Sequence, residues 1–340
     1  MTVTTRRTAL ASLAALAASP LLSLPAWAQT GLKISHQFPG GTVTEGDFRD
    51  RLTRMFAAEV EKRSKGALKF SIYPGSSLMK TNAQFSAMRK GALDLSLVPL
   101  SYAGGEVPEV NIGLMPGLVT SYDQAYSWKN AEVGKELNRI LNEKGIIMVS
   151  WIWQAGGMAS RTKPVIDPGD AKGMKIRGGS REMDLMLKAA GAAVVTLPSN
   201  EIYAAMQTGA MEAALTSSTS LISFRLEEVS KALTTGRAGS YWFMLEPLMM
   251  SKAIFDRLPK DQQQLILTVG AELEAFALKS SKEDDQQVAT VYQKAGAKVA
   301  DMNPAALKKW QAIARATAWK DYGEKNASCA NLLKLAEKTL

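Results

Sequence analysis

Short apolar strands alternate with amphipathic helices along the first part of the chain. Residues 32–35 and 68–72 alternate apolar with polar side chains, which is the period of a half-buried strand. Between them, residues 48–60 repeat apolar side chains every three or four positions, and the run stops before Gly66, which predicts a helix. A strand, a helix and a second strand in this order predict an α/β fold.

The alternation continues further along the chain. Residues 125–143 predict a helix that leads through Gly145 into one apolar strand, residues 146–153. After Pro247 the pattern becomes mostly helical, and residues 261–292 predict one helix long enough to brace two lobes. Roughly 310 residues follow residue 28, more than one compact core usually holds, which also favours two lobes.

An internal repeat supports two similar units. Residues 85–94 and 203–212 share the pattern aromatic-x-x-Met-x-x-Gly-Ala, and each predicts a helix, a glycine stop and a buried strand. A polar turn follows each copy, with Tyr102 in the first and Thr216 and Ser217 in the second. The alternative is that helix, glycine and strand are simply common in α/β proteins. If the two units face each other, both turns lie in one cleft.

The N-terminus has the features of an export signal. Arg6 and Arg7 precede an uncharged run that ends in Ala26-Trp27-Ala28, a small-x-small cleavage site, so we predict a cleaved signal over residues 1–28. The arginine pair also suggests a twin-arginine signal, but Ala9 stands where that motif usually has phenylalanine, and the export route stays open. A buried first helix is the alternative, and Pro20 and Pro25 argue against it.

Composition narrows the functional class. The net charge is +9, but basic and acidic residues alternate, as in Arg49-Asp50-Arg51, which argues against nucleic acid and favours attraction of small anions. A single cysteine, Cys329, excludes a disulfide within the chain, and with only one histidine a His/Cys metal site is not expected. Neither a Gly-x-Ser-x-Gly elbow nor a Walker-type loop is present, so we predict no catalytic residues and no cofactor. A secreted hydrolase is the alternative.

The segment from Asp170 to Ser218 carries the candidate chemistry. Residues 170–179 predict a turn, a short strand and a flexible exit, with Arg177 at the carboxyl end of the strand, the edge where ligands bind in open α/β sheets. A later strand, residues 211–215, brings Thr216 and Ser217 to the same edge. Because a guanidinium matches a carboxylate in two parallel hydrogen bonds, this pattern favours a carboxylate ligand.

Three segments, residues 64–70, 172–177 and 201–209, occur in an order that resembles the DctP-like extracytoplasmic solute receptors of TRAP transporters, which capture organic acids. The resemblance runs from about Leu32 to about Gly270. It implies a two-lobed periplasmic binding protein fold with a hinge, a ligand cleft between the lobes and long C-terminal helices. By the same resemblance, the chain crosses between lobes near Gln154, Leu245 and Asp284. Lobe 1 would then comprise 29–154 plus 245–284, and lobe 2 would comprise 155–244 plus 285–340.

The resemblance also implies roles for individual residues. Arg177 matches the family's ligand-carboxylate arginine; the alternative is a surface ion pair. Thr216 and Ser217 stand where many relatives have asparagine and proline, and their hydroxyls would bind a ligand oxygen or simply cap the strand. Ser199 falls where some relatives carry a pocket aromatic residue, which would widen the pocket.

A second family arginine is missing. Gly156 or Gly157 stands in its place, with Arg161 a few residues downstream, which puts the acid-sugar modes of the family in doubt. Gln154 resembles the glutamine of relatives that bind a keto acid through a metal ion. Their acidic metal ligand is replaced by Phe243, so we predict no metal.

Aromatic residues near the lobe crossings suggest the ligand's shape. Trp153 and Trp242 would form a wall for stacking; the alternative is that they belong to the core. A wall favours an aromatic or bulky monocarboxylate over succinate-like dicarboxylates and sugar acids. His36, after the first strand, would hydrogen-bond the ligand or be structural. We expect a periplasmic monomer that delivers its ligand to TRAP membrane subunits; a ligand-sensing partner of a periplasmic signalling receptor is the other alternative.

Overall fold

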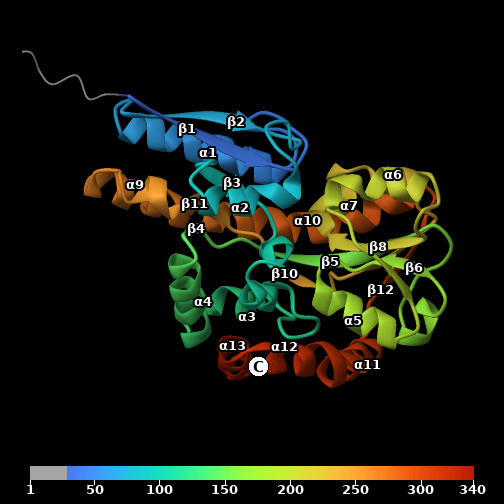
Figure 1. Cartoon of the computed structure of the whole chain (residues 1–340). Helices are drawn as coiled ribbons and strands as arrows, with labels where there is room; N and C mark the ends of the chain where they lie inside the picture. The colour runs from blue at the N-terminus through green and yellow to red at the C-terminus, as the bar shows by residue number, and fades with distance from the viewer. Residues whose placement is uncertain (1–28) are drawn as a thin grey trace, which may run out of the picture.

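The computed structural model describes residues 29–340. The predicted export signal, residues 1–28 with the Arg6-Arg7 pair, lies outside the described residues. Two sheets stand side by side with helices packed around them, and the C-terminal helices run beneath both (Figure 1). The predicted two-lobed α/β class is confirmed.

The first sheet has five strands and lies with the N-terminal part of the chain. We call it and its helices the five-stranded half. In spatial order the strands are β2 (Leu68–Tyr73), β1 (Thr30–His36), β3 (Leu95–Leu97), β11 (Leu248–Ser251) and β4 (Ile146–Ser150). β1 runs parallel to β2 and β3, whereas β11 runs antiparallel to both of its neighbours. The sheet therefore combines two widely separated parts of the sequence.

Helices cover both faces of this sheet because its strands carry apolar side chains on both faces. In β4, Ile147 and Val149 face one core cluster, and Met148 faces another. The helices of this half are α1 (Phe48–Arg63), α2 (Gln84–Arg89), α3 (Tyr122–Ser127), α4 (Glu132–Glu143), α8 (Lys252–Phe255) and α9 (Lys260–Glu272). Helices α1 and α9 pack on the Ile147 face, and α2 and α4 pack on the Met148 face.

The second sheet has seven strands and forms, with its helices, the seven-stranded half. Its spatial order is β12 (Lys298–Asp301), β9 (Ala232–Thr235), β5 (Trp153–Ser160), β8 (Ala213–Ser217), β6 (Lys175–Arg177) and β7 (Ala193–Val195), with β10 (Phe243–Leu245) paired to the start of β5. Its helices are α5 (Arg181–Ala189), α6 (Ile202–Gln207) and α7 (Ser218–Ser223). The parallel pairing of β6 with β8 brings their carboxyl ends to one edge.

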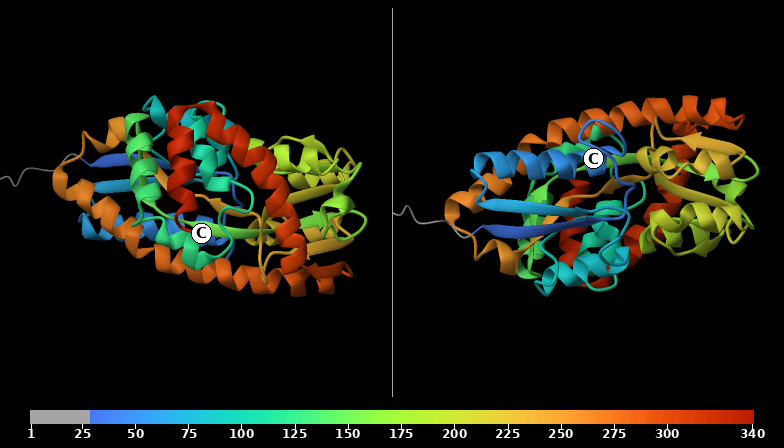
Figure 2. Two further views of the ribbon diagram at one scale, coloured as in Figure 1. Left: turned by 90° about the horizontal axis from the view of Figure 1, so that it is seen from below. Right: turned by 90° about the horizontal axis from the view of Figure 1, so that it is seen from above.

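Three elements connect the halves. The chain passes from β4 to β5 through Trp151 and Ile152 and returns from β10 to β11 through Glu246 and Pro247; the Glu246 amide donates to the Ile152 carbonyl at 2.8 Å. Helix α10 (Glu274–Lys294) contacts α1 and α9 at one end and β9 and β12 at the other, and Figure 2 shows it extending along both halves. The assignment of residues to lobes remains a prediction.

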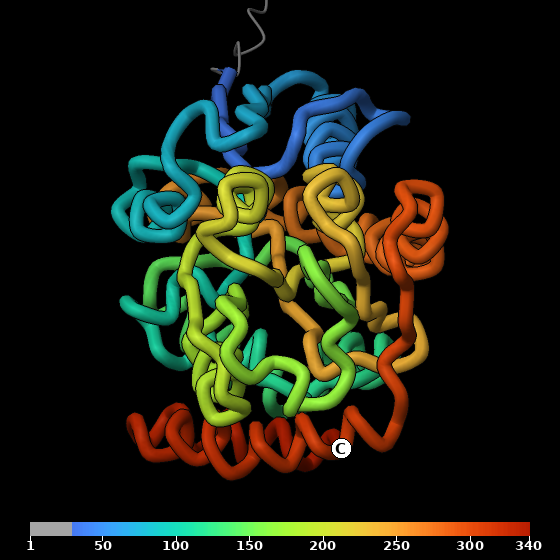
Figure 3. Tube along the Cα trace, turned by 90° about the vertical axis from the view of Figure 1, so that its right-hand side faces the viewer, coloured from blue at the N-terminus to red at the C-terminus, as the bar shows by residue number. Residues whose placement is uncertain are grey.

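The C-terminal helices α11 (Pro304–Ala314), α12 (Lys320–Lys325) and α13 (Ala327–Glu337) also span both halves. α11 packs on α5, while α13 packs on α4, and the three helices lie at the bottom of Figure 3. Within residues 29–340, no helix is long and apolar enough to cross a membrane.

Three predicted elements are interrupted. The strand predicted over residues 146–153 is two strands in different sheets, β4 and β5. The helix predicted over 125–143 is two helices, α3 and α4. Trp128 lies between them, is buried, and meets the Trp153 ring edge to face with the ring centroids 5.3 Å apart. The helix predicted over 261–292 is divided at Leu273 into α9 and α10.

The internal repeat has the same form in both halves. Helices α2 and α6 each stop at a glycine in the left-handed region, Gly91 with φ 70° and Gly209 with φ 77°. Each glycine leads toward a strand, β3 in one half and β8 in the other. The polar turns that follow lie at the boundary between the halves, since the Tyr102 hydroxyl accepts a hydrogen bond from the Ser199 amide at 2.9 Å.

The close packing of β5 against Trp242 gives a testable prediction. A Cβ on Gly156 would lie 2.3 Å from the Trp242 ring and 2.4 Å from the Thr216 carbonyl oxygen. We expect Gly156→Ala to lower the free energy of unfolding by ~1–3 kcal/mol, the usual cost of overpacking. Thermal unfolding measures it. Gly169→Ala is the matched control, because nothing lies within 4 Å of its Cβ. Equal melting temperatures for the two variants would contradict the packing described.

Candidate ligand-binding site

Arg177 lies at the edge where strands of the seven-stranded half end. It is the last residue of β6 and pairs with Ala214 of β8, so its side chain leaves the sheet beside the carboxyl end of β8. Only 2% of the residue is exposed. Short parallel strands followed by turns therefore place a cation inside the molecule, where a charge needs a partner.

All partners of Arg177 are neutral. Nε donates to the Leu197 carbonyl at 3.1 Å, Nη1 donates to the Leu215 carbonyl at 2.7 Å, and Nη2 donates to the Tyr102 hydroxyl at 2.9 Å. Within the part of the chain that the structure describes, no carboxylate lies within ion-pair distance of this guanidinium. Burial raises the pKa of Asp184 to about 6, and attraction to Arg177 offsets only part of that shift. The charge of Arg177 thus lacks a contacting counter-ion.

Tyr102 closes the site from the five-stranded half. Its hydroxyl accepts from both Arg177 and the Ser199 amide, which leaves its own hydrogen available for an acceptor. Beside it is a cavity of about 330 Å³ at the boundary between the halves. The cavity is lined by Asn82, Ser101, Tyr102, Gly104, Gly105, Asn111, Gly179, Ser180, Arg181, Thr196, Leu197 and Pro198. Two direct partners of Arg177, Tyr102 and Leu197, therefore line it.

Thr216 and Ser217 lie near Arg177, at the end of β8. Thr216 pairs with Gly157 of β5, and both hydroxyl residues are buried. Ser217 is the N-cap of α7, because its hydroxyl accepts from the Ser220 amide at 3.1 Å. The sequence left two roles open for Ser217, binding of a ligand oxygen and capping. The hydrogen bond to the Ser220 amide favours capping.

Gln154 lies next to Glu246, the residue at the return crossing. Its Nε2 donates to Glu246 Oε2, and one oxygen of each side chain, Oε1 in both cases, is buried without a hydrogen-bond partner. No three His, Cys, Asp or Glu side chains in residues 29–340 are grouped to hold a metal ion. Within residues 29–340, both oxygens are therefore buried acceptors without a donor.

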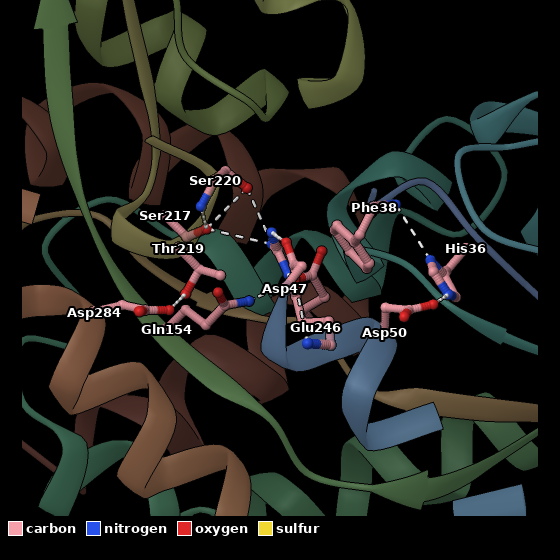
Figure 4. Close-up of polar contacts among 11 residues, drawn as sticks. His36, Phe38, Asp47, Asp50, Gln154, Ser217, Thr219, Ser220, Glu246 and Asp284 are labelled. Atoms are coloured by element: carbon pink, nitrogen blue, oxygen red, sulfur yellow. Dashed lines mark hydrogen bonds and ion pairs between the residues drawn. The ribbon is translucent and has the colours of Figure 1, made fainter. Parts of the chain in front are cut away.

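Arg49 is a buried cation that the sequence interpretation missed. It is the second residue of α1, its side chain is fully buried, and it pairs with Asp47 at 2.6 Å and with Glu246 at 3.1 Å. Figure 4 shows Ser217, Ser220, Asp47 and Glu246 gathered at this place. In the sequence the Arg49-Asp50-Arg51 run served only as an example of alternating charge, whereas in the structure Arg49 and Asp50 are both buried. The sequence feature that could have indicated the burial of Arg49 is the helical period, because position 49 shares a face with the apolar Leu52 and Phe56.

His36 has a structural environment. Its Nε2 contacts Asp50 Oδ1 at 3.0 Å, its Nδ1 accepts from the Phe38 amide at 3.3 Å, and its ring stacks on Phe38 (Figure 4). With both ring nitrogens engaged, the structural alternative is favoured over ligand binding.

The two tryptophans do not form an exposed wall. Trp153 is fully buried against Trp128, and its indole N–H has no hydrogen-bond partner in the described part of the chain. Trp242 is 1% exposed and donates from Nε1 to the Gly178 carbonyl at 3.0 Å. Neither residue lines the 330 Å³ cavity. The structure therefore gives no support to stacking of a bulky ligand on these rings.

Trp242 also explains the missing second arginine. Its ring covers Gly156, so the space next to that position is filled. Arg161 follows the far end of β5 and lies beside Gly209, at the edge opposite Gln154. Arg161 is thus not brought together with Arg177.

The sequence profile of the bacterial extracellular solute-binding proteins, family 7, matches residues 40–326. This chain belongs to that family. The resemblance to the DctP-like receptors is confirmed, and because the family consists of binding proteins, the receptor interpretation is favoured over a hydrolase.

Known relatives match between about three quarters and nearly the whole of the chain. A solute-binding protein of Albidiferax ferrireducens is 75% identical over 98% of this chain and 99% of its own. The crystal structure of a TRAP periplasmic solute-binding protein from Rhodoferax ferrireducens with bound malonate is 77% identical, has a TM-score of 0.90, and covers 91% of this chain and 98% of its own. The 2,3-diketo-L-gulonate-binding periplasmic protein of Escherichia coli is 27% identical over 76% of this chain and 79% of its own.

The receptor contains several buried carboxyl groups between its halves. Burial raises the pKa of Glu246 to about 7, although Arg49 and Gln154 partly offset the effect. Burial likewise raises the pKa of Asp284, which accepts from the Thr219 hydroxyl at 2.6 Å, and the pKa of Asp285, each to about 6. A carboxyl group whose pKa is higher in the folded than in the unfolded state contributes stability while it is protonated, and this contribution is lost as the group ionises.

We expect the free energy of unfolding to fall as pH rises from about 4.5 to about 7, because Glu246 then loses its proton in a buried place. Glu246→Gln should make this decline shallower, since the amide does not titrate. Urea unfolding at pH 5, 6 and 7 measures both slopes. Identical slopes for the variant and the natural protein would contradict the raised pKa of Glu246.

Proposed function

We propose that this receptor captures a small organic acid whose carboxylate pairs with Arg177. The observation that carries the proposal is that Arg177 is 2% exposed and, among residues 29–340, has only neutral hydrogen-bond partners. A buried charge without a partner is costly, and a carboxylate supplies the missing negative charge together with matching acceptor geometry.

Arg177 retains the donors that such a ligand needs. A guanidinium has five N–H groups, and three hydrogen bonds engage one group each on Nε, Nη1 and Nη2, so one N–H remains on each terminal nitrogen. The Tyr102 hydroxyl hydrogen adds a donor from the opposite half. A carboxylate held by both halves would be bound more tightly when they are together, which favours hinge closure around the ligand.

The ligand is small in this proposal. The cavity beside Tyr102, about 330 Å³, is near the lower end of the ~300–1,000 Å³ usual for ligand pockets. The burial of Trp153 and Trp242 removes the support for a bulky acid. The similar structure from Rhodoferax ferrireducens holds malonate, a short acid, which agrees with a short ligand here.

Receptors of TRAP transporters work with membrane subunits, and we propose that this chain delivers its acid to such subunits from the periplasm as a monomer. Light scattering during gel filtration tests the monomer. A role as the ligand-sensing partner of a signalling receptor would use the same site, and the genes beside this one would distinguish the two roles.

Arg177→Ala should remove most carboxylate binding, because truncating one side of a buried ion pair costs ~2–5 kcal/mol. Arg177→Lys should also bind weakly, since a lysine cannot offer the planar fork. Titration calorimetry with malonate, succinate and pyruvate measures the affinities. The matched control is Arg237→Ala, which removes an arginine that pairs with Asp301 elsewhere on the surface. If Arg177→Ala binds these acids as the natural protein does, Arg177 is not the anchor.

Short acids should bind more tightly than bulky ones, because the cavity is small and no aromatic ring lines it except that of Tyr102. The same calorimeter gives the ranking when malonate and pyruvate are compared with benzoate and glucuronate. If benzoate binds most tightly, stacking of the ligand on Trp153 and Trp242 is favoured after all, and the argument from the size of the cavity is wrong.

A further inference from the structure

We propose that Arg49 is the residue that latches the two halves together in the closed receptor. The proposal rests on the hinge closure proposed above, and it assigns to Arg49 a positioning role rather than contact with the ligand. Its basis is that the guanidinium is fixed firmly in one half and extends hydrogen bonds to the other.

Within the five-stranded half, Arg49 is held rigidly. Asp47, the N-cap of α1, accepts from Nε at 2.9 Å and from Nη2 at 2.6 Å, a two-point pairing that fixes the plane of the guanidinium. The guanidinium carbon lies 3.7 Å from the centroid of the Phe38 ring, a cation–π contact. Because these contacts come from the same half, Arg49 is oriented before the halves meet.

Across the boundary, one nitrogen of Arg49 makes the remaining contacts. Nη1 donates to Ser220 Oγ at 3.0 Å and lies 3.4 Å from Ser217 Oγ, and both serines belong to the seven-stranded half. Nη1 also donates to Glu246 at the crossing, at 3.1 Å. Separation of the halves would break the serine contacts and leave the Asp47 pair intact, so the serine bonds stabilise only the closed arrangement.

The latch is connected to the Arg177 site through β8. The Leu215 carbonyl accepts from Arg177, and two residues later Ser217 contacts Arg49 and caps α7. The end of one strand therefore contacts both arginines. A ligand that fixes the end of β8 through Arg177 also fixes the position at which Arg49 meets the seven-stranded half.

Arg49 is not suited to be a second ligand anchor. A ligand carboxylate placed there would meet the negative charge of Asp47 and a Glu246 carboxyl group that already accepts from Nη1. The environment of Arg177 is the reverse, since no carboxylate contacts it. The same residue type thus has two different roles in one cleft.

The test removes one hydrogen-bond acceptor of Arg49 and leaves its ion pairs with Asp47 and Glu246 in place. Ser220→Ala deletes the acceptor at 3.0 Å, and Ser223→Ala is the matched control, because Ser223 is on the same helix and its hydroxyl makes no hydrogen bond. Malonate affinity and dissociation rate are measured by calorimetry and stopped flow. Distances between spin labels at exposed Lys62 and Lys188, on α1 and α5, report the fraction of closed molecules.

For Ser220→Ala we expect about tenfold weaker malonate binding, the effect of losing one hydrogen bond to a charged group, mainly through faster dissociation. The spin-label distances should shift to longer values than in Ser223→Ala. Arg49→Lys, which keeps the charge and loses the fork, should change affinity and distances in the same direction. Equal affinities and distances for Ser220→Ala and Ser223→Ala would overturn the latch.

Two further outcomes are decisive. If Arg49→Lys weakens malonate but leaves pyruvate unchanged, and Ser220→Ala affects neither, Arg49 is a second carboxylate anchor and the latch is wrong. If the natural protein binds none of the acids, the proposed function fails; the spin-label distances of ligand-free Ser220→Ala then still decide the latch, because the serine contact exists without ligand.

Discussion

The structure depends on one electrostatic constraint, the burial of the Arg177 charge without a contacting carboxylate. A positive charge in a low-dielectric interior is tolerated only if an anion neutralises it or if dense hydrogen bonding compensates. Arg177 has the hydrogen bonds, to two carbonyls and one hydroxyl, but no anion. Arg49 is just as buried and has two carboxylates. On this contrast rests our proposal that Arg177 binds the acid and that Arg49 holds the two halves together.

The fold brings these groups together from distant parts of the sequence. β6 and β8 end at the same edge, the turn after β3 brings Tyr102 over that edge, and α1 begins opposite β8 with Asp47 and Arg49. The paired crossings at Ile152 and Glu246 lie between the halves, joined by a backbone hydrogen bond. Any movement of the halves thus acts on the contacts of both arginines.

Local patterns in the sequence predict most strands and helices and the position of Arg177 at a strand end. These patterns mislead where a contact between residues distant in the sequence determines the local structure. Residues 146–153 form one apolar run, and nothing local shows that Ser150 and Trp153 belong to different sheets. The role of Trp242 depends on Gly156, a residue far away in the sequence. The alternating charges around Arg49 gave no sign of its burial, although its helical position already placed it on the apolar face of α1.

The most direct test of the central claim is a crystal structure of the receptor grown with malonate. The account predicts one carboxylate with its oxygens within hydrogen-bond distance of Arg177 Nη1 and Nη2, the Tyr102 hydroxyl donating to the same group, and Arg49 still paired with Asp47. A carboxylate bound elsewhere, with the Arg177 guanidinium still contacting only the Leu197 and Leu215 carbonyls and the Tyr102 hydroxyl, would contradict it.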